Sequence, residues 1–361
     1  MAGNIPDPSK TRVLVTGSSG YLGTHCVQQL LNQGYIVRGT VRNLKNEKKV
    51  QPLRSLSHAS DRLELVEADL DDSDSWFATV KDCDYVFHTA SPFPIVADDT
   101  VVETAVNGTL HVLKACAKEF SVKKVVLTSS CASINEGHDD ENRIFNEKDW
   151  TIQDSPKVLQ YPKSKTAAER CAWDFINNFG ALDNKFALTC INPTLIVGPL
   201  LMDTQGTSIT IIRRFLNNEM PAVPALNLAL VDVRDVAKAH ILAMTNRKSD
   251  GERILVTAQP SFWFRDISKC LAKEFRHQGY WLPWLQAPYF VLYIYSIFDD
   301  QAKAILDRVN RQVKFDNSKA TKLLGLQFRN PEHSLIDMAY SMIERGILPK
   351  KCGFNEKNFK D

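Results

Sequence analysis

A tyrosine and a lysine lie four positions apart in the run Y-P-K-S-K that begins at Tyr161 and ends at Lys165. Residues at this spacing face the same side of a helix, so a phenol and an ammonium group would be neighbours. A phenol donates a proton to an oxygen on which negative charge develops, and a nearby cation favours its ionised form. We therefore expect Tyr161 to be a proton donor whose pKa is lowered by Lys165.

A hydroxyl group follows the apolar run over 124–128, where Ser129 and Ser130 end a predicted strand. Ligands bind at the carboxyl ends of parallel strands, so Ser130 would lie beside a bound ligand. A ketone or aldehyde that accepts hydride develops charge on its oxygen and needs both a hydrogen bond and a proton there. The combination of Ser130, Tyr161 and Lys165 therefore indicates carbonyl reduction, in which Lys165 also orients the hydride carrier.

A glycine-rich turn near the N-terminus predicts where a dinucleotide binds. It follows the apolar run over 12–16 and precedes a helical pattern over 25–32. In such a G-x-x-G-x-x-G turn the glycines allow a tight bend, close approach of a pyrophosphate, and packing of helix on strand, with the helix N-terminus toward the phosphates. The expected contacts in the turn are Gly17, Ser19, Gly20, Tyr21, Leu22 and Gly23.

The end of the second predicted strand indicates which nicotinamide cofactor is used. An acidic residue usually follows that strand in NAD-binding units, but residues 35–46 contain no Asp or Glu. Arg42 lies at this position instead, and Lys49 follows. Because a guanidinium group binds phosphate in a bidentate manner, we expect NADP(H), with Arg42 and Lys49 at the 2′-phosphate.

Short apolar runs that alternate with helical patterns predict an α/β fold: a Rossmann doubly wound parallel sheet with a smaller, mixed C-terminal substrate lobe. Helices are expected over 101–117 and 167–176. We expect an NADP-binding domain over 10–192 with a return segment at about 228–258, and a substrate lobe from 193–227 and 259–348. The expected strands are 12–16, 35–41, 63–66, 85–88, 124–128 and 186–191.

Composition narrows the class of protein. The 361 residues include 44 Lys and Arg against 42 Asp and Glu, a balance that gives no reason to expect nucleic acid as a partner. The eight cysteines form no C-x-x-C pair, and no histidine follows them at the spacing typical of metal ligands. We therefore expect reduced thiols and no metal site. The first twelve residues are polar and resemble no secretory signal, which favours a cytoplasmic protein.

The segment from Gly279 to Phe298 carries no charge and is crowded with aromatic residues. Pro283 and Pro288 interrupt it, so a membrane-spanning helix is excluded. We interpret it as a helix packed across the small lobe or over a substrate pocket. A peripheral membrane contact or a dimer contact through 281–298 is the alternative, and whether the chain is a monomer or a homodimer stays open.

Four further motifs carry a family resemblance over about residues 10–260. They are V-R-G-T-V-R at 37–42, L-T-S-S at 127–130, K-T-A-A-E at 165–169 and N-P-T-L-I-V-G-P at 192–199. With the glycine turn and Tyr161, they resemble the extended short-chain dehydrogenases/reductases, specifically the dihydroflavonol 4-reductase and cinnamoyl-CoA reductase group. The resemblance implies that Ser130, Tyr161 and Lys165 form the catalytic set.

The same resemblance implies further contacts. Asn107 would lie on a helix near the active site, and Asn135 would contact the substrate as in dihydroflavonol reductases. Tyr161 and Lys165 would also touch the cofactor. The remaining implied cofactor contacts are Asp69 and Leu70 at the adenine, Thr89 and Ala90 at the middle of the molecule, and Pro193 and Val197 at the nicotinamide carboxamide.

The leading hypothesis is an NADPH-dependent reductase of a ketone or aldehyde on a small apolar or aromatic substrate. A 3β-hydroxysteroid dehydrogenase or sugar-nucleotide epimerase relative, and a non-catalytic protein that senses NADP(H), are the alternatives. The residues before Tyr161 read K-V-L-Q and lack the cinnamoyl-CoA reductase signature, so no particular substrate is assigned. We expect His88 and His240 to be buried and hydrogen-bonded rather than catalytic.

Overall fold

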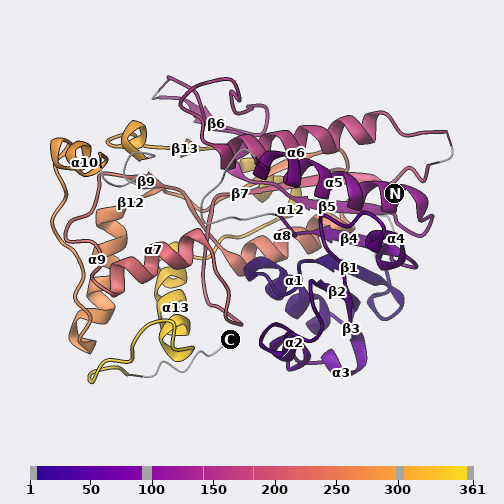
Figure 1. Cartoon of the computed structure of the whole chain (residues 1–361), viewed down its shortest axis with the longest axis horizontal. Coiled ribbons are helices and arrows are strands. Elements are labelled where there is room, and N and C mark those ends of the chain that lie inside the picture. The colour runs from indigo at the N-terminus through magenta and orange to yellow at the C-terminus, as the bar shows by residue number, and fades with distance from the viewer. Residues whose placement is uncertain (1–5, 92–99, 141, 182, 298–304, 356–361) are drawn as a thin grey trace.

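A seven-stranded parallel sheet forms the centre of the molecule in the computed structural model (Figure 1). The structure describes residues 6–91, 100–140, 142–181, 183–297 and 305–355. Chain order reverses between β1 and β4, which is the crevice where dinucleotides bind in such sheets. The order across the sheet is β3 (Leu63–Glu67), β2 (Ile36–Val41), β1 (Arg12–Thr16), β4 (Tyr85–His88), β5 (Lys124–Thr128), β7 (Ala187–Pro193) and β11 (Arg253–Val256).

Helices cover both faces of this sheet because its strands are apolar on both sides. In β1, Leu14 packs on one side, whereas Val13 and Val15 pack on the other. The Leu14 side is covered by α4 (Ser75–Val80), α5 (Thr100–Lys118) and α6 (Gln160–Asn177). The opposite side is covered by α1 (Tyr21–Asn32), α2 (Glu47–Arg54), α8 (Val233–Thr245) and α12 (Ser318–Leu324), and α3 (Ala59–Arg62) leads into β3. The predicted Rossmann-type fold is thereby confirmed.

A second hydrophobic core lies beyond the carboxyl ends of β7 and β11. Its helices, at the left of Figure 1, are α7 (Thr207–Leu216), α9 (Phe264–Phe275), α10 (Tyr289–Tyr295) and α13 (Pro331–Glu344). Three two-stranded sheets join the parts, namely β8 (Leu195–Val197) with β10 (Leu230–Asp232), β9 (Asn227–Leu228) with β12 (Phe262–Trp263), and β6 (Ile144–Phe145) with β13 (Lys314–Phe315).

One segment departs from the expected division into lobes. We expected 259–348 to belong to the substrate lobe, but α12 packs within the nucleotide-binding core. Ala320, Leu324 and Leu326 share that core with side chains of α1 and α8. The chain thus returns to the first domain at α12, a return that the positions of its prolines and glycines did not predict.

The uncharged aromatic segment also differs from the expected long packed helix. Only Tyr289–Tyr295 is helical, after an extended stretch that contains Pro283 and Pro288. Most of its large side chains are exposed instead of covering the lobe. Phe298, the last residue of the predicted segment, lies outside the described residues. In the part of the chain that the structure describes, no helix is both long and apolar enough to cross a membrane.

Candidate active site

The glycine turn between β1 and α1 has the close packing that its sequence predicts. Gly17 has φ of +64°, and its N–H donates to Thr40 Oγ1 at 2.9 Å. A Cβ added at Gly23 would lie 2.3 Å from the Gly17 carbonyl oxygen, so only glycine fits there. Helix α1 begins at Tyr21, four residues before the predicted start, so its free N–H groups lie within the turn itself.

The side chains expected at the turn do not all point toward a dinucleotide. The side chain of Leu22 belongs to the hydrophobic core, so only its backbone is available to a phosphate. The Tyr21 hydroxyl donates to the Gly198 carbonyl at 2.6 Å and so connects α1 to the chain after β8. Ser19 and Gly20 are partly exposed in the turn.

Two cations lie near each other after β2. Arg42 is exposed and its charge, after burial, contributes to lowering the pKa of Lys49. The Lys49 ammonium donates to the Asp203 carbonyl at 2.6 Å, which holds it beside the loop that precedes α7. Two positive charges therefore lie together beyond the end of β2.

The other residues implied for the cofactor lie at the carboxyl edge of the sheet. Thr89 and Ala90 follow β4, and the Ala90 Cα and Cβ would contact a Cβ on Gly17 at 3.1 Å, so this loop closes on the glycine turn. Asp69 and Leu70 follow β3, where their carbonyls accept from Trp76 Nε1 and bond with the His111 ring, each at 2.8 Å.

Two more of these residues end strands later in the chain. Pro193 is the last residue of β7, and Val197 is the buried end of β8. Both therefore lie at the carboxyl ends of strands.

Ser130 and Tyr161 meet at the same edge of the sheet. Ser130 follows β5 and caps the short turn over Cys131–Ser133, accepting from the Ala132 N–H at 3.1 Å. Tyr161 lies in the first turn of α6, and its hydroxyl is hydrogen-bonded to the Ser130 side chain. Lys165 lies one turn further along α6 and is buried.

Burial controls the pKa values in this group. It raises the pKa of Tyr161 to about 12, although the hydrogen bond to Ser130 works in the opposite direction. We expected Lys165 to lower the pKa of Tyr161, but in the chain alone the pKa of Tyr161 is raised. Burial also lowers the pKa of Lys165 to about 8, and the charge of Glu169 opposes this change. At neutral pH the pair is thus a protonated phenol beside an ammonium group.

A buried ionic network behind these residues was not predicted. The fully buried Glu169 carboxylate pairs with Arg253 Nε at 2.6 Å, from β11. It also accepts from Ser129 at 2.5 Å, Ser133 at 2.6 Å and Asn192 Nδ2 at 2.8 Å. Two features of the sequence mark these charges: Glu169 lies four residues after Lys165, and Arg253 is the one charged residue of the apolar run over 253–256. The network fixes α6 to three strand ends.

The two asparagines implied by the resemblance have different surroundings. Asn135 donates weakly to Glu136 at 3.3 Å, but its side-chain oxygen is buried without a hydrogen-bond partner. Glu136 in turn pairs with Arg308 at 2.6 Å. Asn107 lies on α5 with its side chain exposed. Of these two asparagines, Asn135 is thus the one with a buried polar atom that has no partner.

His88 and His240 are buried and hydrogen-bonded, as expected. His88 bonds Thr16 Oγ1 at 2.9 Å, and burial followed by the charge of Lys165 lowers its pKa to about 3. His240 bonds Thr128 Oγ1 at 2.7 Å and the Val236 carbonyl at 2.8 Å. Over the described ranges, no group of three or more His, Cys, Asp and Glu residues is arranged to hold a metal ion.

Residues 13–257 match the NAD dependent epimerase/dehydratase family. The chain belongs to this family. Among its curated relatives, cinnamoyl-CoA reductase 1 of Arabidopsis thaliana is 34% identical, with 96% of this chain and 93% of the relative covered. An anthocyanidin reductase of Vitis vinifera, named as (2S)-flavan-3-ol-forming, is also 34% identical, over 76% and 84% of the two chains.

A solved structure of another reductase is also similar to this chain. Yeast methylglyoxal/isovaleraldehyde reductase Gre2, complexed with NADPH, superimposes with a TM-score of 0.77 at 28% identity. The match covers 92% of this chain and 98% of that one. The resemblance to reductases of the dihydroflavonol and cinnamoyl-CoA type is confirmed.

Proposed function

We propose that this protein reduces a ketone or aldehyde on a small apolar or aromatic molecule with NADPH, and that Tyr161 supplies the proton. The observation that supports this most directly is the hydrogen bond between the Tyr161 and Ser130 hydroxyls, with Lys165 buried one turn away. In this arrangement both hydroxyls reach the same carbonyl oxygen. The bound cofactor supplies hydride to the carbonyl carbon, and the chain supplies everything that acts on the oxygen.

Each residue has a separate task in this proposal. Ser130 donates a hydrogen bond to the carbonyl oxygen, which is where charge develops in the transition state. Because burial keeps the Tyr161 pKa above the physiological range, its hydroxyl is protonated and gives that oxygen a proton. Lys165, an ammonium group at neutral pH, stabilises the phenolate that remains and donates to the cofactor ribose.

The residues around the glycine turn fit a 2′-phosphorylated dinucleotide. The turn has no room for side chains at Gly23, and α1 directs its free N–H groups into it. Arg42 and Lys49 provide two neighbouring positive charges beyond β2, where an acidic residue would repel a phosphate. We infer that these two residues select NADPH over NADH.

The substrate would lie between the two hydrophobic cores. We assign 10–192 and about 228–258 to cofactor binding, and 193–227 with 259–348, apart from α12, to substrate binding. The unpartnered oxygen of Asn135 supports this placement, because a substrate hydroxyl or amide could donate to it. Cinnamoyl-CoA thioesters are less suited, since the cinnamoyl-CoA reductase signature is absent before Tyr161.

The test is NADPH oxidation by the purified chain with a panel of aromatic aldehydes, diketones, dihydroflavonols and a hydroxycinnamoyl-CoA thioester. Turnover is expected with ketones or aldehydes and not with the thioester. If no compound of the panel caused steady oxidation of NADPH, at concentrations where NADPH binds, the proposal would be contradicted. Arg42→Ser should raise KM for NADPH at least tenfold without changing KM for NADH. The control Arg54→Ser, at the end of α2, should change neither KM.

A further inference from the structure

The exposed aromatic face around α10 is unlike the rest of the surface. Among the described residues, fourteen large apolar side chains are exposed, and nine of them fall between Trp281 and Ile297. Trp284 is 61% exposed and Phe290 is 65% exposed. Scattered apolar residues are normal on a protein surface, but such a concentration indicates a binding surface.

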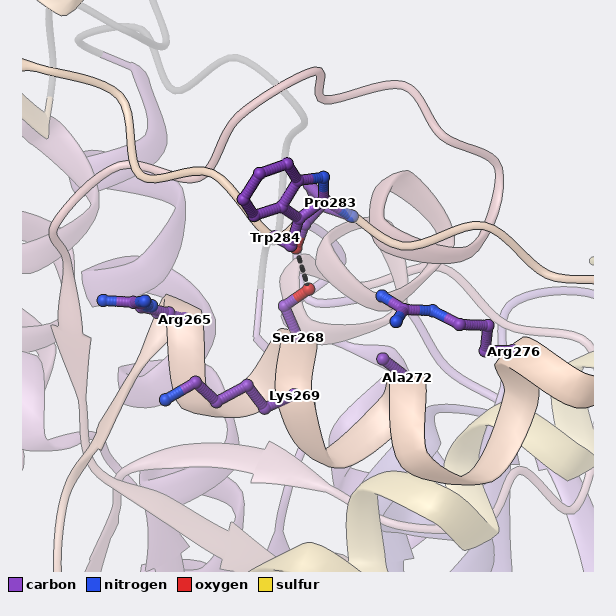
Figure 2. A pocket seen from close by; sticks show the side chains of 7 residues that line it. All are labelled: Arg265, Ser268, Lys269, Ala272, Arg276, Pro283 and Trp284. Carbon is purple, nitrogen blue, oxygen red and sulfur yellow. Dashed lines mark hydrogen bonds between the residues drawn. The ribbon is translucent and has the colours of Figure 1, made fainter.

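The backbone that carries this face is fixed. The Val223 N–H donates to the Leu285 carbonyl, and the Ala287 N–H donates to the Val223 carbonyl, both at 2.9 Å. Ser268 on α9 donates to the Pro283 carbonyl, as the dashed line in Figure 2 shows. The stretch over 283–287 that leads into α10 is therefore attached to the lobe by hydrogen bonds, while the large side chains around it are exposed.

Three cations border the aromatic face. Arg265 and Lys269 on α9, and Arg276 just after its end, line a hollow together with Pro283 and Trp284 (Figure 2). Lys269 is 4.0 Å from Asp266, but in the described part of the chain no carboxylate lies within 4.0 Å of Arg265 or Arg276. Arg276 also lies beside Trp281. Positive charge and exposed indole rings thus occur at one edge of the lobe.

We propose that the 281–297 face, together with Arg265, Lys269 and Arg276, binds the surface of a membrane that contains anionic phospholipids. Trp and Tyr side chains are suited to the boundary between headgroups and acyl chains, where one end of the ring is wet and the other apolar. Lys and Arg beside such residues attract the phosphates of the headgroups. Since α10 has seven residues, the protein would lie on the bilayer and not span it.

A second copy of the chain fits this face less well. A two-fold interface buries the same patch of both copies, so it would bring two sets of these three cations into one contact. The sequence from 279 to 298 provides no carboxylate, so among the described residues Asp266 beside Lys269 is the one ion-pair partner of these cations. An anionic bilayer supplies the opposite charge together with the apolar environment, which is why the lipid surface is the preferred occupant.

Sedimentation with vesicles tests the proposal with the full chain. Wild-type protein should sediment with phosphatidylcholine vesicles that contain 30% phosphatidylserine, less with pure phosphatidylcholine, and less in high salt. The triple variant Arg265→Gln, Lys269→Gln, Arg276→Gln should lower the partition coefficient about 100-fold, at about fivefold per cation. Trp284→Ser with Phe290→Ser should lower it at least tenfold.

Matched controls carry the same changes elsewhere. Arg54→Gln, Arg247→Gln and Lys248→Gln remove two arginines and a lysine from other exposed sites, and Phe77→Ser with Phe120→Ser removes two exposed aromatic rings. Both controls should sediment like wild type. Equal loss in a control, or failure of the wild type to bind either vesicle, would overturn the proposal. So would a wild-type dimer that Trp284→Ser with Phe290→Ser converts to a monomer, since that result assigns the face to a second copy.

Discussion

The phenol of Tyr161 matters in our proposal only once charge develops on the substrate oxygen, and this gives a prediction at the scale of one residue. Tyr161→Phe should lower kcat by about 10²- to 10⁴-fold, the usual contribution of a positioned acid. The affinity for NADPH should change little, because the variant keeps the ring and removes only the oxygen. Steady-state kinetics and a fluorescence titration with NADPH measure the two quantities. Full turnover by the variant would remove Tyr161 from the mechanism.

Lys165 gives a prediction about pH. Because burial lowers its pKa to about 8, the ammonium group predominates below that pH and is lost above it. The pH profile of kcat/KM should therefore fall as the pH rises through about 8. In Lys165→Arg the guanidinium stays protonated, so any remaining activity should lack this fall. A variant that keeps the fall near pH 8 would mean that another group titrates.

At the residue scale, the sequence was enough to predict which side chains would meet but not their pKa values. Spacing and strand position placed Ser130 and Tyr161 at one edge of the sheet, and the structure brings their hydroxyls together. The direction of the Tyr161 shift depends on how much protein surrounds the ring. Burial is a property of the folded chain, and the four-residue spacing of Tyr161 and Lys165 gives no information about it.

At the scale of elements, periodicity located the strands well because both faces of the central sheet are apolar. All six predicted strands begin within one residue of the observed ones, as β1 and β5 show. Helix starts were less predictable. Helix α1 begins inside the glycine turn, where the conformation of the backbone and not the pattern of side chains determines the first helical residue. The link between α6 and β11 through Glu169 and Arg253 joins residues 84 positions apart, so local patterns mark each charge but do not predict that the two pair.

This buried link gives the prediction for elements. Glu169→Gln should lower the free energy of unfolding by about 3–5 kcal/mol, because it leaves the Arg253 charge buried without its partner. Glu252→Gln is the matched control, since the Glu252–Lys319 pair is partly exposed and should be worth under about 1 kcal/mol. Urea denaturation at pH 7 measures both variants. Equal costs would mean that the Glu169 pair contributes no more than a surface pair.

At the scale of the whole molecule, the sequence predicted two lobes but not how the C-terminal chain is shared between them. Proline and glycine positions marked the start of the second lobe, yet α12 returns to the first because Ala320 and Leu324 complete its core. The leading interpretation of 279–298 was a packed helix, with a membrane or dimer contact as the alternative, since a sequence shows hydrophobicity and not what covers it. The exposure of residues in this segment became visible only from the three-dimensional arrangement.

Three buried histidines couple the stability of the whole chain to pH. Burial lowers the pKa of His25 and of His240 to about 4 and that of His88 to about 3, all below the ordinary value of 6.5. Between pH 6.5 and 4 the unfolded chain therefore binds more protons than the folded one. This contribution to stability is complete above pH 6.5 and is lost as the pH falls toward 4.

Urea denaturation between pH 7 and pH 5 measures this loss. The free energy of unfolding should fall by about 2 kcal/mol per histidine on going to pH 5. His240→Gln should remove about a third of the pH dependence, because the amide can still donate to the Val236 carbonyl but does not titrate. His277→Gln changes an exposed ring and should leave the dependence as in wild type. Carboxylates whose pKa is lowered, such as Asp232, titrate below this window, so they do not obscure it. A stability that is flat from pH 7 to 5 would show that the three rings are protonated as readily in the folded chain as in the unfolded one.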